Sequence, residues 1–69
     1  MKPHETLAAL QNAYDDLTTA LVLLDRAVDG AKVVGVSSVV YDDHRRGQLY
    51  LRSLRERIAS EYGRRALGR

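Results

Sequence analysis

The segment Val33–Glu56 restricts the possible folds of this chain more than any other part of the sequence. Lys32–Asp43 is rich in β-branched residues and poor in helix formers, a composition typical of extended structure. A polar break follows at His44–Gly47, and a second short β-prone run lies at Gln48–Arg52. Because a single strand would leave its backbone groups unpaired, the two runs are predicted to pair as a β-hairpin over residues 32–52.

A capping-box pattern comes directly after the predicted hairpin. Ser53 and Glu56 have the Ser-x-x-Glu spacing, in which each side chain accepts a hydrogen bond from the other residue's backbone N–H. The pattern predicts that Ser53 caps a helix over residues 53–66, followed by a basic tail at residues 67–69. Leu54, Ile58 and Tyr62 would form the apolar stripe of this helix.

The N-terminal part of the chain has a regular helical pattern. Its apolar residues recur at alternating spacings of three and four, which indicates a helix with one continuous apolar seam. These residues are Leu7, Leu10, Tyr14, Leu17, Leu21, Leu24 and Val28. They predict a helix over residues 4–29 with Gly30 at its C-terminal end. Asp29-Gly30 also fits a hairpin turn, but the seven-position seam outweighs one dipeptide.

The predicted fold class is therefore α+β, in a single domain of 69 residues. Its elements are an N-terminal amphipathic helix, a β-hairpin, a second helix and a basic C-terminal tail. A chain of this length buries only about 60% of the surface that its unfolded form exposes. Since it has no cysteine to form a disulfide, oligomerisation is the expected additional source of stability.

Charge is divided unevenly along the chain. Residues 1–43 carry three basic and seven acidic residues, a net charge of −4, whereas residues 44–69 carry eight arginines and two glutamates, a net charge of +6. Such asymmetry indicates a nucleic-acid surface or copies packed with acidic parts against basic parts, although a solvated basic face would look the same.

The sequence contains few residues that are placed to support catalysis. His4 and His44 are predicted to be solvated, and the adjacent carboxylates of Asp15–Asp16 and Asp42–Asp43 point in different directions on a helix or strand. No catalytic residue, metal ligand or cofactor site is predicted, and the protein is not expected to be an enzyme. Without a long apolar run or a signal-peptide pattern, a soluble protein made in the cytoplasm, with no membrane contact, is expected.

Two groups of side chains are candidates for contacts with partners. Tyr41 and Tyr50 are predicted on the outer face of the hairpin, where an interface is the expected use. The predicted contacts to an acidic protein surface or to DNA are Arg45, Arg46, Arg64, Arg65 and Arg69.

The order of these elements resembles that of the small head-to-tail joining proteins of tailed phages, of the lambda protein W type. The similarity spans residues 5–65, although the turn lacks the usual Asp-Gly or Gly-Gly and the first helix is longer. The residues that carry it are Glu5-Thr6-Leu7-Ala8-Ala9-Leu10, Val33-Val34-Gly35-Val36, Asp43-His44-Arg45-Arg46 and the spacing from Leu54 to Ile58-Ala59.

The resemblance implies a structural virion protein that completes the portal or neck of a filled capsid and provides the docking surface for the next connector or tail component. It would form a homo-oligomeric ring, contact the portal and the adjacent neck or tail proteins, and reside in the virion neck after assembly in the host cytoplasm. Non-specific DNA contact in the channel is also implied. The alternative prediction is a small nucleic-acid-binding accessory or regulatory protein.

Overall fold

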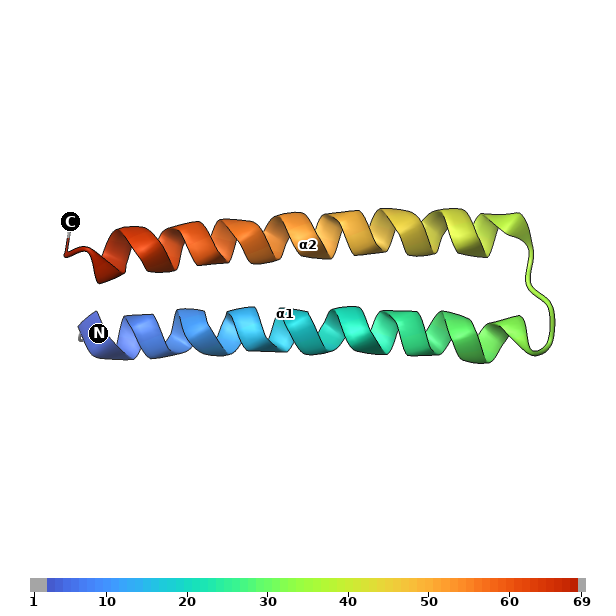
Figure 1. Cartoon of the computed structure of the whole chain (residues 1–69), viewed down its shortest axis with the longest axis horizontal. Coiled ribbons are helices and arrows are strands. Elements are labelled where there is room, and N and C mark those ends of the chain that lie inside the picture. Colours follow the sequence, from blue (N-terminus) through green and yellow to red (C-terminus); the bar gives the residue numbers. More distant parts are fainter. Residues whose placement is uncertain (1–2, 69) are drawn as a thin grey trace.

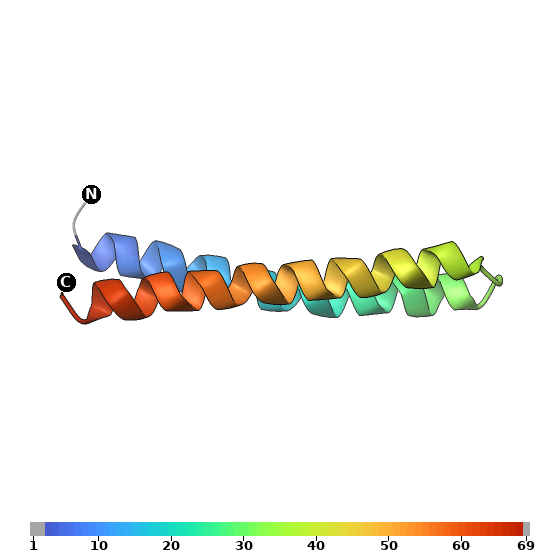
Figure 2. The ribbon, with the colours of Figure 1, turned by 90° about the horizontal axis from the view of Figure 1, so that it is seen from above.

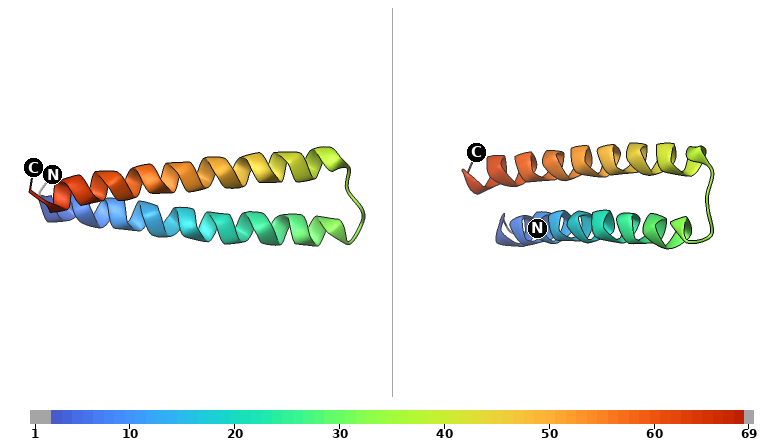
Figure 3. Two further views of the ribbon diagram at one scale, coloured as in Figure 1. Left: turned by 45° about the horizontal axis from the view of Figure 1, so that its top comes forward. Right: turned by 45° about the vertical axis from the view of Figure 1, so that its right-hand side comes forward.

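The chain folds into a helical hairpin, seen in a computed structural model that describes residues 3–68 and the side chains of residues 5–68. Helix α1 spans Pro3–Lys32 and helix α2 spans Ser38–Ala66, and the two run antiparallel side by side (Figure 1). They cross at a shallow angle in the view of Figure 2. The start of α1 and the end of α2 lie at one end of a rod of 50 × 15 × 14 Å, and the connection lies at the other (Figure 3).

The predicted α+β class is wrong, because residues 3–68 contain no β-strand. Residues 38–52, predicted as most of the β-hairpin, form the first half of α2, and only residues 33–37 between the helices are non-helical. The helix predicted over residues 53–66 is the second half of the same helix. The helix predicted over residues 4–29 lies within α1, which continues to Lys32.

A second seam explains why the β-prone segment is helical. Half-buried residues recur along α2 at spacings of four and three, and they face the seam of α1. They are Val40, His44, Gly47, Leu51, Leu54, Ile58 and Glu61. A β-branched residue lowers helix stability by no more than about 0.7 kcal/mol, whereas burying half of a leucine or isoleucine side chain contributes about 0.8–1.5 kcal/mol, half of the value for full burial. Packing against α1 therefore overrides the local preference for strand.

The turn between the helices depends on Gly35 rather than Gly30. Gly35 has a positive φ of 76°, and its N–H donates to the carbonyl of Lys32 at 3.1 Å. This left-handed conformation suits glycine and ends α1, while Gly30 lies inside the helix. Ser37, in an extended conformation, is the N-cap of α2, although its side chain makes no capping hydrogen bond.

The interior between the helices is thin. Val28, with 7% of its surface exposed, is the only buried residue in the described part of the chain. The other seam residues of α1 are half-buried, because two helices can cover each other from one direction only. The hairpin thus leaves both flanks of its seam within reach of solvent or of another protein.

Candidate interaction surface

One flank of the seam is closed by polar contacts between the helices, and we call it the polar side. The Gln48 amide donates to Asp25 Oδ1 at 2.6 Å, and His44 Nε2 lies 2.9 Å from the same oxygen. Arg55 Nη1 donates to Thr18 Oγ1 at 3.2 Å. These side chains bridge α1 and α2 along one edge of the apolar seam.

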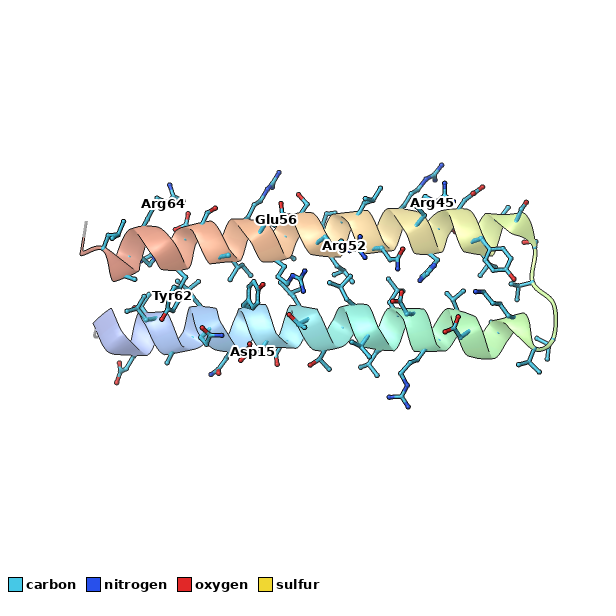
Figure 4. All side chains as sticks on the ribbon, viewed as in Figure 1. Asp15, Arg45, Arg52, Glu56, Tyr62 and Arg64 are labelled. Carbon is cyan, nitrogen blue, oxygen red and sulfur yellow. The ribbon has the colours of Figure 1, made fainter. Side chains whose placement is uncertain are left out.

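The polar side continues toward the turn and toward the helix ends. Near the turn, Lys32 Nζ lies 5.8 Å from the centre of the Tyr41 ring, within the range of a cation–π contact. Near the start of α1 and the end of α2, the polar side has an open pocket of about 220 Å³ in place of a polar bridge. It is lined by Leu10, Gln11, Tyr14, Ile58, Ala59 and Tyr62. Figure 4 shows Tyr62 directed toward α1.

The contacts on the polar side fix the register of the two helices. Two residues are level when they lie at the same height along the rod. Lys32 is level with Tyr41, Asp25 with Gln48, and Thr18 with Arg55, so each pair lies seven residues from the last on both helices. In an antiparallel helix pair, residues that flank the seam on one side face each other, and so do those on the other side. The register therefore identifies the residues on the opposite flank, which we call the open side.

The open side comprises mostly small and apolar residues of α1, together with Asp16, beside larger residues of α2. From α1 it contains Ala13, Asp16, Ala20, Leu23 and Ala27, and from α2 it contains Asp43, Tyr50 and Arg57. Leu23 is 54% exposed and Tyr50 is 70% exposed. Between these residues no hydrogen bond or ion pair joins the two helices. A hollow of about 90 Å³, lined by Tyr50, Ser53, Leu54 and Arg57, lies on the same flank of α2.

Asp25 is the described carboxylate with the clearest electrostatic perturbation. Its hydrogen bond with the His44 ring lowers the pKa of its carboxyl below the ordinary value of 3.8. The Gln48 donor and the positive charges of His44 and Arg52 act in the same direction, while partial desolvation opposes them. Since the Asp25 side chain is 52% exposed, solvent weakens all of these effects. The cluster is a structural contact between helices.

The predicted arginine contacts do not form one cluster. Arg46 pairs with Asp43 at 3.9 Å, Arg64 and Arg65 both pair with Glu61, and Arg45 has no ion pair among the described residues. Eighteen residues of helix, about 27 Å, separate Arg46 from Arg64. Figure 4 shows Arg45 and Arg64 directed away from α1. Arg69 lies outside the described residues, as does the His4 side chain.

The two predicted interface tyrosines lie on different sides of the seam. Tyr41 belongs to the polar side, where its ring contacts Lys32, whereas Tyr50 belongs to the open side. The prediction that both share one outer face of a hairpin is therefore wrong. The capping prediction is also wrong, because Ser53 and Glu56 are exposed residues in the middle of α2. Helical hydrogen bonds already occupy the backbone groups that they would cap.

His44 differs from its prediction as a solvated loop residue. It lies in the seam of α2 with 19% of its side chain exposed, and its partner is Asp25. Sequence reasoning missed this cluster and the Arg55 contacts. The signal was present as the seven-residue repeat Tyr41, Gln48, Arg55, Tyr62, which becomes visible once residues 38–66 are taken as one helix.

Among residues 5–68, whose side chains the structure describes, no group of three or more histidine, cysteine, aspartate or glutamate side chains could hold a metal ion. Neither α1 nor α2 combines the length and the apolar character that a membrane span requires. The chain matches no protein-family model, no curated protein and no solved structure.

Proposed function

We propose that this protein is a non-enzymatic assembly module, which acts by packing its helical hairpin against a further α-helical protein surface. The observation that carries the proposal is the excess of exposed surface. The chain exposes 5,412 Å², whereas a compact monomer of its mass, 7.7 kDa, exposes about 4,300 Å². The difference, about 1,100 Å², exceeds the roughly 800 Å² that each partner buries in a standard interface.

The shape of the molecule supports the same proposal. Its radius of gyration is 15.8 Å, whereas a compact domain of 69 residues has a radius of about 11 Å. The exposed surface includes Leu23, Leu49 and Tyr50, each more than half exposed. A rod whose described residues include a single buried side chain gains stability chiefly by covering more of its apolar surface.

Joining phage heads to tails is a finer form of this assembly role. The resemblance to the lambda protein W type depends on a β-hairpin, and residues 3–68 contain none, so the architectural argument for that role no longer applies. The role stays a prediction, and co-assembly tests it. If Arg64 and Arg65 dock on a portal, their joint replacement by serine should reduce the number of tailed particles. Equal numbers would contradict the prediction.

Nucleic-acid binding is a second candidate, favoured by unpaired arginines on α2. Arg45, Arg52 and Arg57 are exposed and make no ion pair among the described residues. Phosphate contacts by these side chains would make binding weaken steeply with salt. A gel shift that is lost when all three are replaced by glutamine would support this function. No shift at low salt would contradict it.

Stability of the isolated chain tests the assembly proposal directly. At low micromolar concentration the monomer is the dominant species. Its free energy of unfolding should then be less than about 5 kcal/mol, and its backbone amides should be weakly protected from hydrogen exchange. Urea unfolding followed by circular dichroism, together with amide hydrogen exchange, measures both. A monomer with the stability of an ordinary domain, about 5–15 kcal/mol, would show that the hairpin needs no partner.

A further inference from the structure

We propose that the partner of the open side is a second copy of this chain, and that two hairpins form a four-helix dimer through their open sides. The inference rests on the proposed assembly function and names its partner. In this dimer the connections of both copies lie at the same end. Each α1 then packs antiparallel between α2 of its own chain and α2 of the second copy.

Charge is the first argument for this partner. Helix α1 carries five carboxylates against Arg26 and Lys32, a net charge of −3, and α2 carries seven arginines against four carboxylates, a net charge of +3. A dimer that places α1 beside α2 of the second copy brings opposite charges together twice, since a twofold interface uses the same patch on both subunits. A dimer that places α1 beside α1 would join two acidic helices.

Register is the second argument. A twofold axis along the rod keeps every residue at its own level, so residues that are level within one hairpin meet those of the second copy. The register fixed by the polar side makes Leu23 level with Tyr50, and Asp16 level with Arg57. The dimer thus pairs Leu23 with Tyr50 of the second copy, and Asp16 with Arg57 of the second copy. Among the described residues of one chain, neither Asp16 nor Arg57 has an ion pair.

The side chains along the open side allow close packing. Ala13, Ala20 and Ala27 recur at every seventh residue of α1, so a neighbouring helix can approach the backbone there. Tyr50 stands opposite this row as a large side chain with two rotatable bonds, a type enriched at the centres of interfaces. Covering this flank would also bury the half-exposed seam residues of both hairpins. The polar side, bridged by hydrogen bonds along its middle and open at the pocket near the helix ends, stays in contact with water.

Mass measurement of the full chain with matched variants tests the interface. At protein concentrations well above low micromolar, sedimentation equilibrium should give twice the chain mass of 7.7 kDa for wild type. Tyr50→Glu, which places a charge on the open side, should raise the dimer dissociation constant by about 30-fold. Leu49→Glu is the matched control, because Leu49 is the adjacent residue, is 61% exposed and lies off both sides of the seam. Equal dissociation constants for the two variants would overturn the proposed interface.

A mixing experiment tests which residues meet between chains. Asp16→Arg and Arg57→Asp should each weaken the homodimer. In each variant, residues 16 and 57 carry the same charge, and they face each other between the copies at two symmetric places. An equimolar mixture of the two variants should form heterodimers, detected by native mass spectrometry, since both contacts become attractive. Contacts within one chain cannot produce this preference. A statistical mixture of homodimers and heterodimers would overturn the assignment of Asp16 to Arg57 of the second copy.

The position of the two connections tests the arrangement. The chain has no cysteine, so Ser37→Cys accepts a single spin label at the turn. Labels on the two copies should lie close together, whereas connections at opposite ends would lie about 50 Å apart, the length of the rod. The long distance would overturn the arrangement. A chain that stays monomeric and marginally stable at high concentration would overturn self-pairing but not the assembly function, and a stable monomer would overturn both.

Discussion

Arg55 of α2 lies over the ring of Tyr14 of α1, with 5.4 Å between the guanidinium carbon and the ring centre. The same guanidinium donates to Thr18 Oγ1, and the Thr18 hydroxyl donates to the Tyr14 carbonyl at 3.1 Å. One side chain of α2 thus contacts two residues one turn apart on α1. This contact fixes both the distance and the register of the helices near the middle of the rod.

Replacing Arg55 should destabilise the hairpin. Arg55→Ala removes a cation–π contact worth about 0.5–1 kcal/mol and a hydrogen bond worth about 0.5–1.5 kcal/mol. We therefore expect the free energy of unfolding to fall by about 1–2 kcal/mol. Urea unfolding at fixed protein concentration measures it, because association would shift the midpoint. Arg45→Ala is the control, since Arg45 is exposed and unpaired among the described residues, and it should change stability by less than about 0.5 kcal/mol.

Replacing Ser53 distinguishes the helical structure from the capping box that the sequence predicts. Ser53 is exposed in the middle of α2, where alanine is the better helix former. Ser53→Ala should therefore raise the free energy of unfolding by about 0.3–0.5 kcal/mol. A helix that began at Ser53 would instead lose about 0.5–2 kcal/mol. The sign of the change in the urea midpoint decides between the two.

The sequence predicted α1 from its seam but not α2, and the difference has a physical cause. The seam of α1 consists of leucine, tyrosine and valine, so its period is visible in the residue types alone. The seam of α2 includes His44, Gly47 and Glu61, which are polar or small. Its period is therefore hidden until α1 supplies the surface that it packs against.

Local propensity misled the prediction most strongly between residues 33 and 43. Val39 and Tyr41 are good strand residues, but they lie in α2, and Val39 is 62% exposed. The Ser-x-x-Glu pattern at Ser53 was a chance spacing within a longer helix. For the candidate surface, the sequence predicted an interface role for Tyr50, but assigning residues to the two sides of the seam requires the register of both helices.

Glycine substitutions should have opposite effects inside the helices and at the turn. Gly30 and Gly63 are helical, and an added Cβ would meet nothing within 4 Å at either position, so each change to alanine should stabilise by about 1 kcal/mol. Gly35→Ala places a Cβ on a residue with φ of 76° and should destabilise by about 1–2 kcal/mol. Thermal melts of the three variants measure this, and stabilisation by Gly35→Ala would contradict the turn geometry.

Acid should weaken the hairpin through Asp25. Its carboxyl has a pKa below the ordinary value of 3.8 because of the hydrogen bond with His44, so the unfolded chain binds a proton more readily than the folded one. The stabilisation is present above pH 3.8 and is lost as the pH falls through the lowered pKa of the folded state. Asp25→Asn lacks this carboxyl. Its urea midpoint should lie below that of wild type at about pH 6, and the gap should close toward about pH 2. Asp42→Asn, a change at an exposed carboxylate without an ion pair among the described residues, should show no such closing gap. A gap for Asp25→Asn that stays constant across this pH range would contradict the prediction.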